Sequence, residues 1–334
     1  MIGCGNVTEV KSGPALGKVP DSSLVAVMRR NIDKARDYAF RHGVKKYFGD
    51  ARQLINDPEV NAIYIATPPN AHEEYAVASM RAGKAVYVEK PMSLTVESCI
   101  RMLEVSKTEK IKLTVAHYRR ALPMFNKIKD LLESQTIGTV RTVRISMLLP
   151  DKAEMIANTE ENWRVKPAVS GGGIFYDLAP HQIDLVNFFF GDMIQSSGFS
   201  ANQGALYEAE DAVSGIIRLK QNILFSGQWC FTANERQKED VFEIVGSEGK
   251  ISFPVFGQEV TLTTGTVETI LKFSPPAHVQ QPMIEKVVRY FLGEGENPCS
   301  AEIAIQSMTV MENFVYGNDS LQVKSAHNRS AASA

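Results

Sequence analysis

Two side chains in the second half of the chain are suited to proton transfer. Asp177 and His181 lie four residues apart, so a helix through this stretch would carry both on one face. A carboxylate one turn away orients an imidazole and raises its basicity. His181 is therefore a candidate acid or base for an alcohol that loses a hydride. Pro180, between them, predicts that a helix starts or kinks nearby. The alternative is that Asp177 and His181 only cap a helix.

A second group of chemically useful residues follows two apolar runs in the first half. The motif from Thr67 to His72 follows the run Ala62–Ala66, and Glu89-Lys90-Pro91 ends the next run, Ala85–Glu89. Open α/β sheets bind ligands at the carboxyl ends of their parallel strands, so both motifs are expected at a binding edge. In a shielded cleft, the Lys90 ammonium can stabilise negative charge that develops on a substrate oxygen. The alternative is that Lys90 is a solvated surface charge.

The chain opens with a glycine motif, Gly3-Cys4-Gly5-Asn6-Val7-Thr8, ahead of a stretch with helical character. Its glycines would let the backbone turn tightly against a pyrophosphate at a helix N-terminus. Thr8 stands where the dinucleotide fingerprint has Gly or Ala, and short glycine patterns also occur in ordinary turns. Only Met1 and Ile2 precede Gly3, whereas a strand usually has about five residues, so we expect a truncated first strand.

Two arginines bear on the choice of dinucleotide. An acidic residue that holds the adenosine ribose is expected at the end of the second strand, but Arg29 and Arg30 stand there. A guanidinium can bind a phosphate with two hydrogen bonds and stack on adenine, which favours NADP over NAD. The alternative is a solvated basic turn.

The first 118 residues show the order of elements of a parallel sheet with crossover helices. Because strands in such a sheet are buried on both faces, their sequences are nearly continuous in apolar character. This half predicts an α/β Rossmann domain, a doubly wound parallel sheet. The expected strands are Leu24–Met28, Lys46–Phe48, Ala62–Ala66, Ala85–Glu89 and Leu113–His117, and the expected helices are Asp33–Arg41, Ala71–Ala82 and Val96–Lys107.

Residues 119–318 follow a different order, which predicts an α+β domain with a large, mainly antiparallel open sheet for substrate binding and oligomerisation. One helix is followed by long strand-like runs without intervening helices, and two helices close the domain. A hairpin turn is expected at Glu248-Gly249. Residues 319–334 have the small, polar composition of a flexible tail. The helices are Leu122–Glu133, Val279–Phe291 and Ala301–Tyr316, and the runs are Val140–Leu149, Ala212–Leu219, Ile223–Phe231 and Val241–Val245.

The composition indicates a globular protein with small-molecule partners. The 334 residues are 44% hydrophobic and 22% charged, with a formal net charge of -2. This balance argues against nucleic-acid or membrane partners, and no run is long enough for a membrane helix. The four cysteines are far apart and form no Cys-x-x-Cys pair, so we expect neither disulfides nor a metal site. With no signal-peptide pattern at the N-terminus, a cytoplasmic location is expected.

Taken together, these motifs resemble the glucose-fructose oxidoreductase / inositol dehydrogenase / MocA family of NAD(P)-dependent oxidoreductases, over nearly the whole chain. The resemblance rests on the glycine motif, the Thr67 to His72 motif, Glu89-Lys90-Pro91, and Gly171-Gly172-Gly173 leading to Asp177 and His181. It implies that Lys90 contacts the substrate hydroxyl and the nicotinamide, and that the Lys90-Pro91 bond is cis. It further implies that His181 is the general acid or base and that Asp177 positions it or the substrate.

The same resemblance extends to further segments, the substrate and the oligomeric state. Asn162-Trp163-Arg164 looks like the segment that reaches the nicotinamide, and Tyr118-Arg119-Arg120 like the crossing between domains. It implies a sugar, inositol or related polyol as substrate and a homodimer or homotetramer formed through the C-terminal sheet. The expected substrate-binding residues are Lys90, Arg119, Asp177 and His181. The expected cofactor-binding residues are Gly3, Gly5, Asn6, Val7, Arg29, Arg30, Thr67, Pro68, Asn70, His72, Glu89, Lys90, Trp163 and Arg164.

Two further functions are compatible with the same motifs. One is a dehydrogenase of a non-sugar diol or carbonyl, and the other is a sensor that binds the dinucleotide without turnover. Lys90, Asp177 and His181 together favour an enzyme, because a protein that only binds has no need of a proton-transfer set.

Overall fold

The computed structural model describes residues 1–151, 153 and 162–317, so the expected tail at 319–334 lies outside the described residues. The chain divides into two compact units. The first contains Met1–Ile128, Ala168–Gly171 and Phe273–Ile305. The second contains Lys129–Pro167, Gly172–Lys272 and the described residues from Gln306 on. The single boundary expected after residue 118 differs from this division, because two later segments also belong to the first unit.

The first unit is built on parallel strands arranged around Ile2. Ile2 forms parallel bridges to Met28 on one side and to Ile65 on the other. It thereby joins the pair β1-β2 to the three strands β3-β4-β5, all of which pair in parallel. The strands are β1 (Ala26–Met28), β2 (Lys46–Phe48), β3 (Ala62–Ile65), β4 (Ala85–Val88) and β5 (Leu113–Val115). The prediction of a doubly wound parallel sheet is confirmed.

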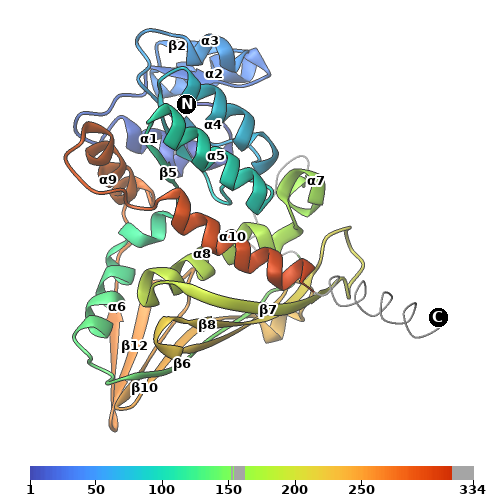
Figure 1. The fold of residues 1–334 in the computed structure, drawn as a ribbon, viewed down its shortest axis with the longest axis vertical. Coiled ribbons are helices and arrows are strands. Elements are labelled where there is room, and N and C mark those ends of the chain that lie inside the picture. Colours follow the sequence, from blue (N-terminus) through green and yellow to red (C-terminus); the bar gives the residue numbers. More distant parts are fainter. Residues whose placement is uncertain (152, 154–161, 318–334) are drawn as a thin grey trace, which may run out of the picture. The chain divides into compact units, whose positions relative to one another are not determined.

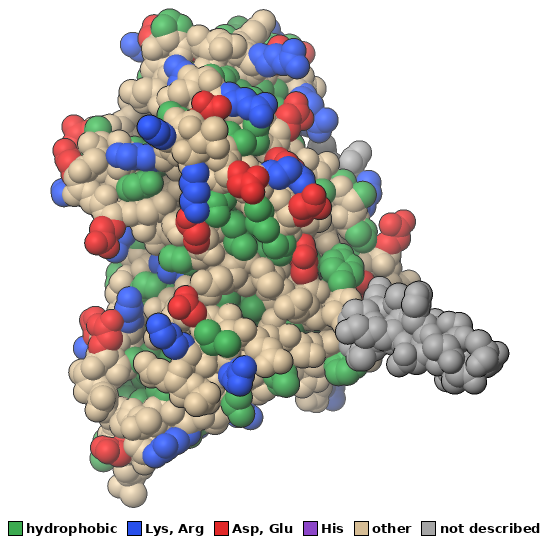
Figure 2. Space-filling view, in the orientation of Figure 1, with side chains coloured by type: hydrophobic (Ala, Val, Ile, Leu, Met, Phe, Trp, Pro, Cys, Tyr) green, Lys and Arg blue, Asp and Glu red, His purple; other side chains and the backbone are tan. Residues whose placement is uncertain are grey.

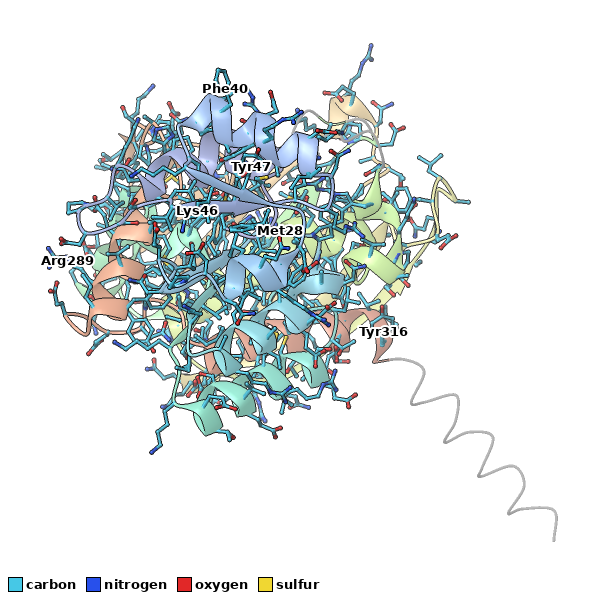
Figure 3. All side chains as sticks on the ribbon, turned by 90° about the horizontal axis from the view of Figure 1, so that it is seen from above. Met28, Phe40, Lys46, Tyr47, Arg289 and Tyr316 are labelled. Carbon is cyan, nitrogen blue, oxygen red and sulfur yellow. The ribbon has the colours of Figure 1, made fainter. Side chains whose placement is uncertain are left out.

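Helices connect these strands, as Figure 1 shows in blue and green. Asn31 caps α2 by accepting a hydrogen bond from the Lys34 backbone N–H, and Gly43 ends the helix in the left-handed conformation. The helices are η1 (Thr8–Ser12), α1 (Gly13–Leu16), α2 (Ile32–His42), α3 (Ala51–Ile55), η2 (Pro69–Ala71), α4 (His72–Arg81), α5 (Val96–Glu109), η3 (Tyr118–Ala121), α6 (Pro123–Glu133), which continues into the second unit, and α9 (Gln281–Leu292). In Figure 3, Phe40 on α2 points outward, and Lys46 and Tyr47 lie on the edge strand β2.

The second unit contains an eight-stranded sheet in the order β13-β12-β11-β10-β6-β9-β8-β7. Only the pair β6 and β9 is parallel among its described ladders, so the prediction of a mainly antiparallel sheet is confirmed. The expected turn joins β10 and β11. The strands are β6 (Val140–Leu148), β7 (Met193–Ala201), β8 (Ala212–Leu219), β9 (Leu224–Cys230), β10 (Glu239–Gly246), β11 (Gly249–Phe253), β12 (Glu259–Thr264) and β13 (Val267–Lys272).

One face of this sheet is covered by helices. Trp229 on β9 is fully buried, with its ring against Phe175 and Phe314, and its indole N–H donates to Gln182 Oε1 at 2.6 Å. These contacts fix α8 (Gly173–Phe190) and the end of α10 (Ala301–Tyr316) on the inner face. The expectation of strands without intervening helices is wrong here, because α8 lies between β6 and β7. Two short helices precede it in the chain, η4 (Trp163–Val165) and α7 (Pro167–Ser170), and most of α7 belongs to the first unit. Two others, η5 (Lys220–Asn222) and η6 (Glu235–Gln237), lie in loops.

Candidate functional site

The glycine motif forms a tight loop at the carboxyl end of the central strand. Gly3 has φ 93°, and a Cβ atom there would lie 2.7 Å from the Ala66 carbonyl carbon and oxygen. Only glycine fits such an approach. A Cβ atom on Gly5, by contrast, would meet no atom within 4 Å. The Thr8 hydroxyl donates to the Gly5 carbonyl at 2.7 Å, so the departure from the fingerprint at this position closes the loop internally.

The loop after β3 lies against this glycine loop and carries an unsatisfied group. The Oγ1 atom of Thr67 is buried and has no hydrogen-bond partner among the described residues. A buried hydroxyl of this kind calls for a partner outside the chain. Together with the open space over Gly5, it shows that these residues fit the phosphates of a dinucleotide at the start of the helix that begins after Gly5.

His72 connects the loop after β3 with the loop after β4. It is fully buried, with Nε2 lying 2.8 Å from the Thr67 carbonyl oxygen. Its Nδ1 atom lies 3.1 Å from the Pro91 carbonyl oxygen and 3.3 Å from that of Met92. Burial lowers the pKa of this imidazole. The ring nitrogens of His72, which was expected to contact the cofactor, thus both face backbone carbonyl oxygens of these loops.

Lys90 follows β4 at the same edge as the glycine loop. Its side chain is partly exposed, and the Lys90-Pro91 peptide bond is cis, as the resemblance implied. Glu89, directly before it, is 7% exposed and accepts hydrogen bonds from the Tyr64 hydroxyl at 2.6 Å and from Gln280 Nε2 at 2.7 Å. The lysine is thus presented at the binding edge, whereas the glutamate is held in the interior.

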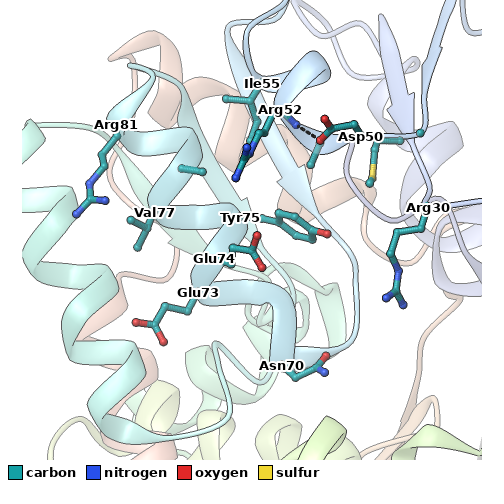
Figure 4. A pocket seen from close by; sticks show the side chains of 14 residues that line it. Arg30, Asp50, Arg52, Ile55, Asn70, Glu73, Glu74, Tyr75, Val77 and Arg81 are labelled. Atoms are coloured by element: carbon teal, nitrogen blue, oxygen red, sulfur yellow. Dashed lines mark hydrogen bonds between the residues drawn. The ribbon is translucent and has the colours of Figure 1, made fainter.

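The two adjacent arginines differ in their surroundings. Arg29 is half-buried, and its Nη1 atom donates to the Cys4 carbonyl of the glycine loop at 3.3 Å. Arg30 is exposed and lines a cavity of about 640 Å³ at the carboxyl ends of β1 and β2. Arg52, Asn70 and Tyr75 line the same cavity, and in Figure 4 the Tyr75 ring points from α4 toward the side on which Arg30 lies. Arg30 is thus exposed at the cavity, whereas Arg29 is hydrogen-bonded to the glycine loop.

The second unit holds the predicted proton-transfer pair on α8. This helix starts at Gly173 and continues through Pro180, so Asp177 and His181 lie one turn apart on a single helix, as predicted. Arg164 Nε donates to Asp177 Oδ2 at 2.8 Å, and its guanidinium lies 4.5 Å from the Trp163 ring centroid. His181 is buried with its ring edge-on to Phe256. Arg164, expected at the nicotinamide, is thus an ion-pair partner of Asp177.

Arg119, expected at the substrate, lies in the first unit and is buried. Its guanidinium carbon lies 5.4 Å from the centroid of the Tyr118 ring and 5.7 Å from that of Phe125.

Tyr64 and Gln280 were not predicted as part of any site. A tyrosine within a buried strand signals that its hydroxyl needs a partner, but the sequence carries no signal for Gln280.

Comparison with known proteins agrees with the fold. A family model described as "Oxidoreductase family, NAD-binding Rossmann fold" matches residues 1–117, and the GFO/IDH/MocA C-terminal domain matches residues 125–252. Oxidoreductase P35 from Formosa agariphila is 45% identical over 314 residues, covering 94% of this chain and 97% of that relative. Myo-inositol 2-dehydrogenase from Thermotoga maritima is 28% identical and covers 79% of this chain and 76% of that relative.

A solved structure has the same fold. Levoglucosan dehydrogenase in complex with NADH and levoglucosan superimposes with a TM-score of 0.82 at 22% identity, covering 94% of each chain. The fold and the family models thus define an oxidoreductase with an NAD-binding Rossmann domain. The chain belongs to the Gfo/Idh/MocA family of oxidoreductases.

Two further features of the described residues concern membranes and metals. Within residues 1–151, 153 and 162–317, the structure has no helix of the length and apolar character that crossing a membrane requires. The same residues contain no cluster of three or more His, Cys, Asp or Glu side chains that could hold a metal ion. Acidic and basic side chains are interspersed on the face shown in Figure 2.

Proposed function

We propose that this protein transfers a hydride between the nicotinamide of NADP and a hydroxyl or carbonyl carbon of a sugar, inositol or related polyol. The observation that carries the proposal is the arrangement on α8, where Asp177 and His181 lie one turn apart and Arg164 anchors Asp177. Relatives named as a myo-inositol dehydrogenase and a levoglucosan dehydrogenase support a polyhydroxylated substrate.

Each side chain has a distinct role in this proposal. As an alcohol is oxidised, His181 accepts the proton of the hydroxyl group while the hydride leaves the carbon that bears this group. The Lys90 ammonium stabilises the negative charge that develops on the substrate oxygen. Asp177 orients His181 or a substrate hydroxyl. The bound cofactor supplies the carbon that accepts the hydride. In the reducing direction His181 returns the proton to the oxygen.

The assay is direct. NADP and NAD are titrated by fluorescence, and aldoses and polyols are then screened for a change in the absorbance of the reduced cofactor. We expect turnover in the wild type and its loss in Lys90→Met and His181→Ala. Turnover that survives both substitutions would discredit the assigned site. Cofactor binding without turnover on any sugar, polyol or other diol would favour a sensor.

The preference for NADP rests on Arg30. Arg30 lines the cavity while Arg29 bonds to the glycine loop, which supports Arg30 rather than Arg29 as the partner of a ribose 2′-phosphate. Arg30→Ala is expected to weaken NADP binding at least about tenfold and to leave NAD binding unchanged. Arg29→Ala is the matched control, and it should weaken both dinucleotides alike. Equal losses for both dinucleotides in Arg30→Ala would refute the preference.

We also propose that the open face of the C-terminal sheet forms a homodimer or homotetramer. Phe199, Ile216 and Leu224 lie on the neighbouring strands β7, β8 and β9 and are exposed by 67%, 61% and 60%. Such an apolar group on one sheet face is typical of an interface. Ile216→Glu is expected to lower the mass measured by light scattering, and a monomeric wild type would contradict the proposal.

A further inference from the structure

A buried hydrogen-bond network surrounds the carboxylate next to Lys90. The Oε1 atom of Glu89 accepts from both the Tyr64 hydroxyl and the Gln280 amide, and its Oε2 atom faces the Lys90 backbone N–H at 3.2 Å. A carboxylate in such a buried position requires hydrogen-bond donors, because it has lost its water. Both donors are themselves buried, and Gln280 is only 1% exposed.

The direction of each hydrogen bond follows from the donors available. A carboxylate only accepts, so the Gln280 NH2 group must point to Glu89. The single proton of the Tyr64 hydroxyl can go to only one acceptor, and Glu89 Oε1 at 2.6 Å is closer than Ser12 Oγ at 3.0 Å. With that proton directed to Glu89, the Ser12 hydroxyl is free to donate to the Tyr64 oxygen. Burial and the neighbouring Glu89 charge keep the pKa of Tyr64 well above its usual value, so the phenol stays a donor.

These groups come from parts of the chain that are far apart in sequence. Ser12 ends the helical segment η1 after the glycine loop, Tyr64 lies on β3, and Gln280 precedes α9. Gln280 and Glu89 are separated by 191 positions. The Gln280 backbone N–H is also directed to the Lys11 carbonyl at 3.4 Å. The carboxylate is therefore held from two sides, and a carboxylate that cannot rotate fixes the backbone N–H of Lys90.

We propose that Tyr64 and Gln280 are positioning residues that act through the Glu89 carboxylate on Lys90. This inference rests on the proposed function, in which Lys90 contacts the substrate oxygen. Loss of either donor frees the carboxylate and lets Lys90 move, whereas the glycine loop and Thr67 keep their own contacts. Loss of a donor is therefore expected to lower kcat and to leave cofactor affinity unchanged.

The kinetic test uses near-isosteric variants. Tyr64→Phe and Gln280→Leu each remove one donor, and we expect kcat to fall about tenfold while cofactor affinity changes by less than about twofold. Gln280→Glu places a second carboxylate against Glu89, and the pair will share one proton. Its kcat is expected near the wild-type value at low pH and to fall as pH rises and that proton is lost. Gln281→Glu, at a partly exposed neighbouring position, is the control with an unchanged pH profile.

A second readout does not depend on turnover. Lysines are reductively methylated with isotopically labelled methyl groups, and the Lys90 resonance is identified by its loss in Lys90→Arg. We expect this resonance to shift in Tyr64→Phe and Gln280→Glu but to stay in place in Gln281→Glu. A Lys90 resonance and a pH profile that are alike in Gln280→Glu and Gln281→Glu would overturn the inference. Lack of wild-type turnover would refute the proposed function alone. If Gln280→Glu does not fold, Tyr64→Phe carries the test.

Discussion

The two glycines of the N-terminal loop provide a sharp pair of perturbations. In Gly3→Ala the new Cβ atom meets the Ala66 backbone at 2.7 Å, and φ is 93°. A non-glycine residue in such a conformation costs on the order of 1–3 kcal/mol, and the clash with backbone atoms adds to this cost. We therefore expect Gly3→Ala to lower the free energy of unfolding by at least about 3 kcal/mol. This is a large part of the total, because a domain is stable by only about 5–15 kcal/mol.

Gly5→Ala is expected to have the opposite profile. Its Cβ atom meets no protein atom within 4 Å, and the backbone there is not left-handed. The free energy of unfolding should therefore stay unchanged or rise by about 0.4–1 kcal/mol, as for other compatible Gly to Ala changes. The same methyl group occupies the space assigned to the pyrophosphate, so cofactor affinity should fall at least about tenfold, or about 1.4 kcal/mol.

Urea unfolding and fluorescence titration with NADP separate the two effects. Gly3→Ala should unfold at a lower urea concentration, whereas Gly5→Ala should unfold as the wild type does and bind NADP more weakly. A Gly5→Ala protein that binds NADP as tightly as the wild type would refute the placement of the pyrophosphate over this loop.

Two further predictions concern ion pairs. Arg164→Gln removes the partner of Asp177, so kcat/KM is expected to fall about 100-fold with cofactor affinity retained; an unchanged kcat/KM would show that the pair plays no part in turnover. The Arg41 hydrogen bond lowers the pKa of Glu9 from 4.5 to about 2, so this carboxylate stabilises the fold above pH 4.5 and loses that effect as pH falls toward 2. Because the pair is partly exposed, the wild type loses about 1 kcal/mol of stability in this pH range. Glu9→Gln should not show this loss, and identical acid unfolding curves for the variant and the wild type would contradict the prediction.

The elements that position the site were predictable where burial leaves a local pattern. The runs at Ala62–Ala66 and Ala85–Glu89 are apolar because both faces of a parallel sheet are covered, and they correspond to β3 and β4. The edge strand β13 and its neighbour β12 carry largely polar or exposed side chains, so periodicity did not reveal them. The helix α8 is apolar around most of its circumference, which gives no amphipathic pattern.

The site was predictable only in part, for a related reason. Motifs placed Lys90, Asp177 and His181 at a strand end and on one helix, because strand ends and helical spacing are local properties. The different surroundings of Arg29 and Arg30 depend on how the backbone passes the glycine loop, which no spacing records. The bond between Gln280 and Glu89 joins positions 191 residues apart and has no sequence signature.

A crystal structure with NADP and a substrate identified in the polyol screen tests the central claim most directly. We expect Lys90 Nζ and a ring nitrogen of His181 both to lie within about 3.2 Å of one substrate oxygen. A complex in which either side chain contacts no substrate atom would contradict it.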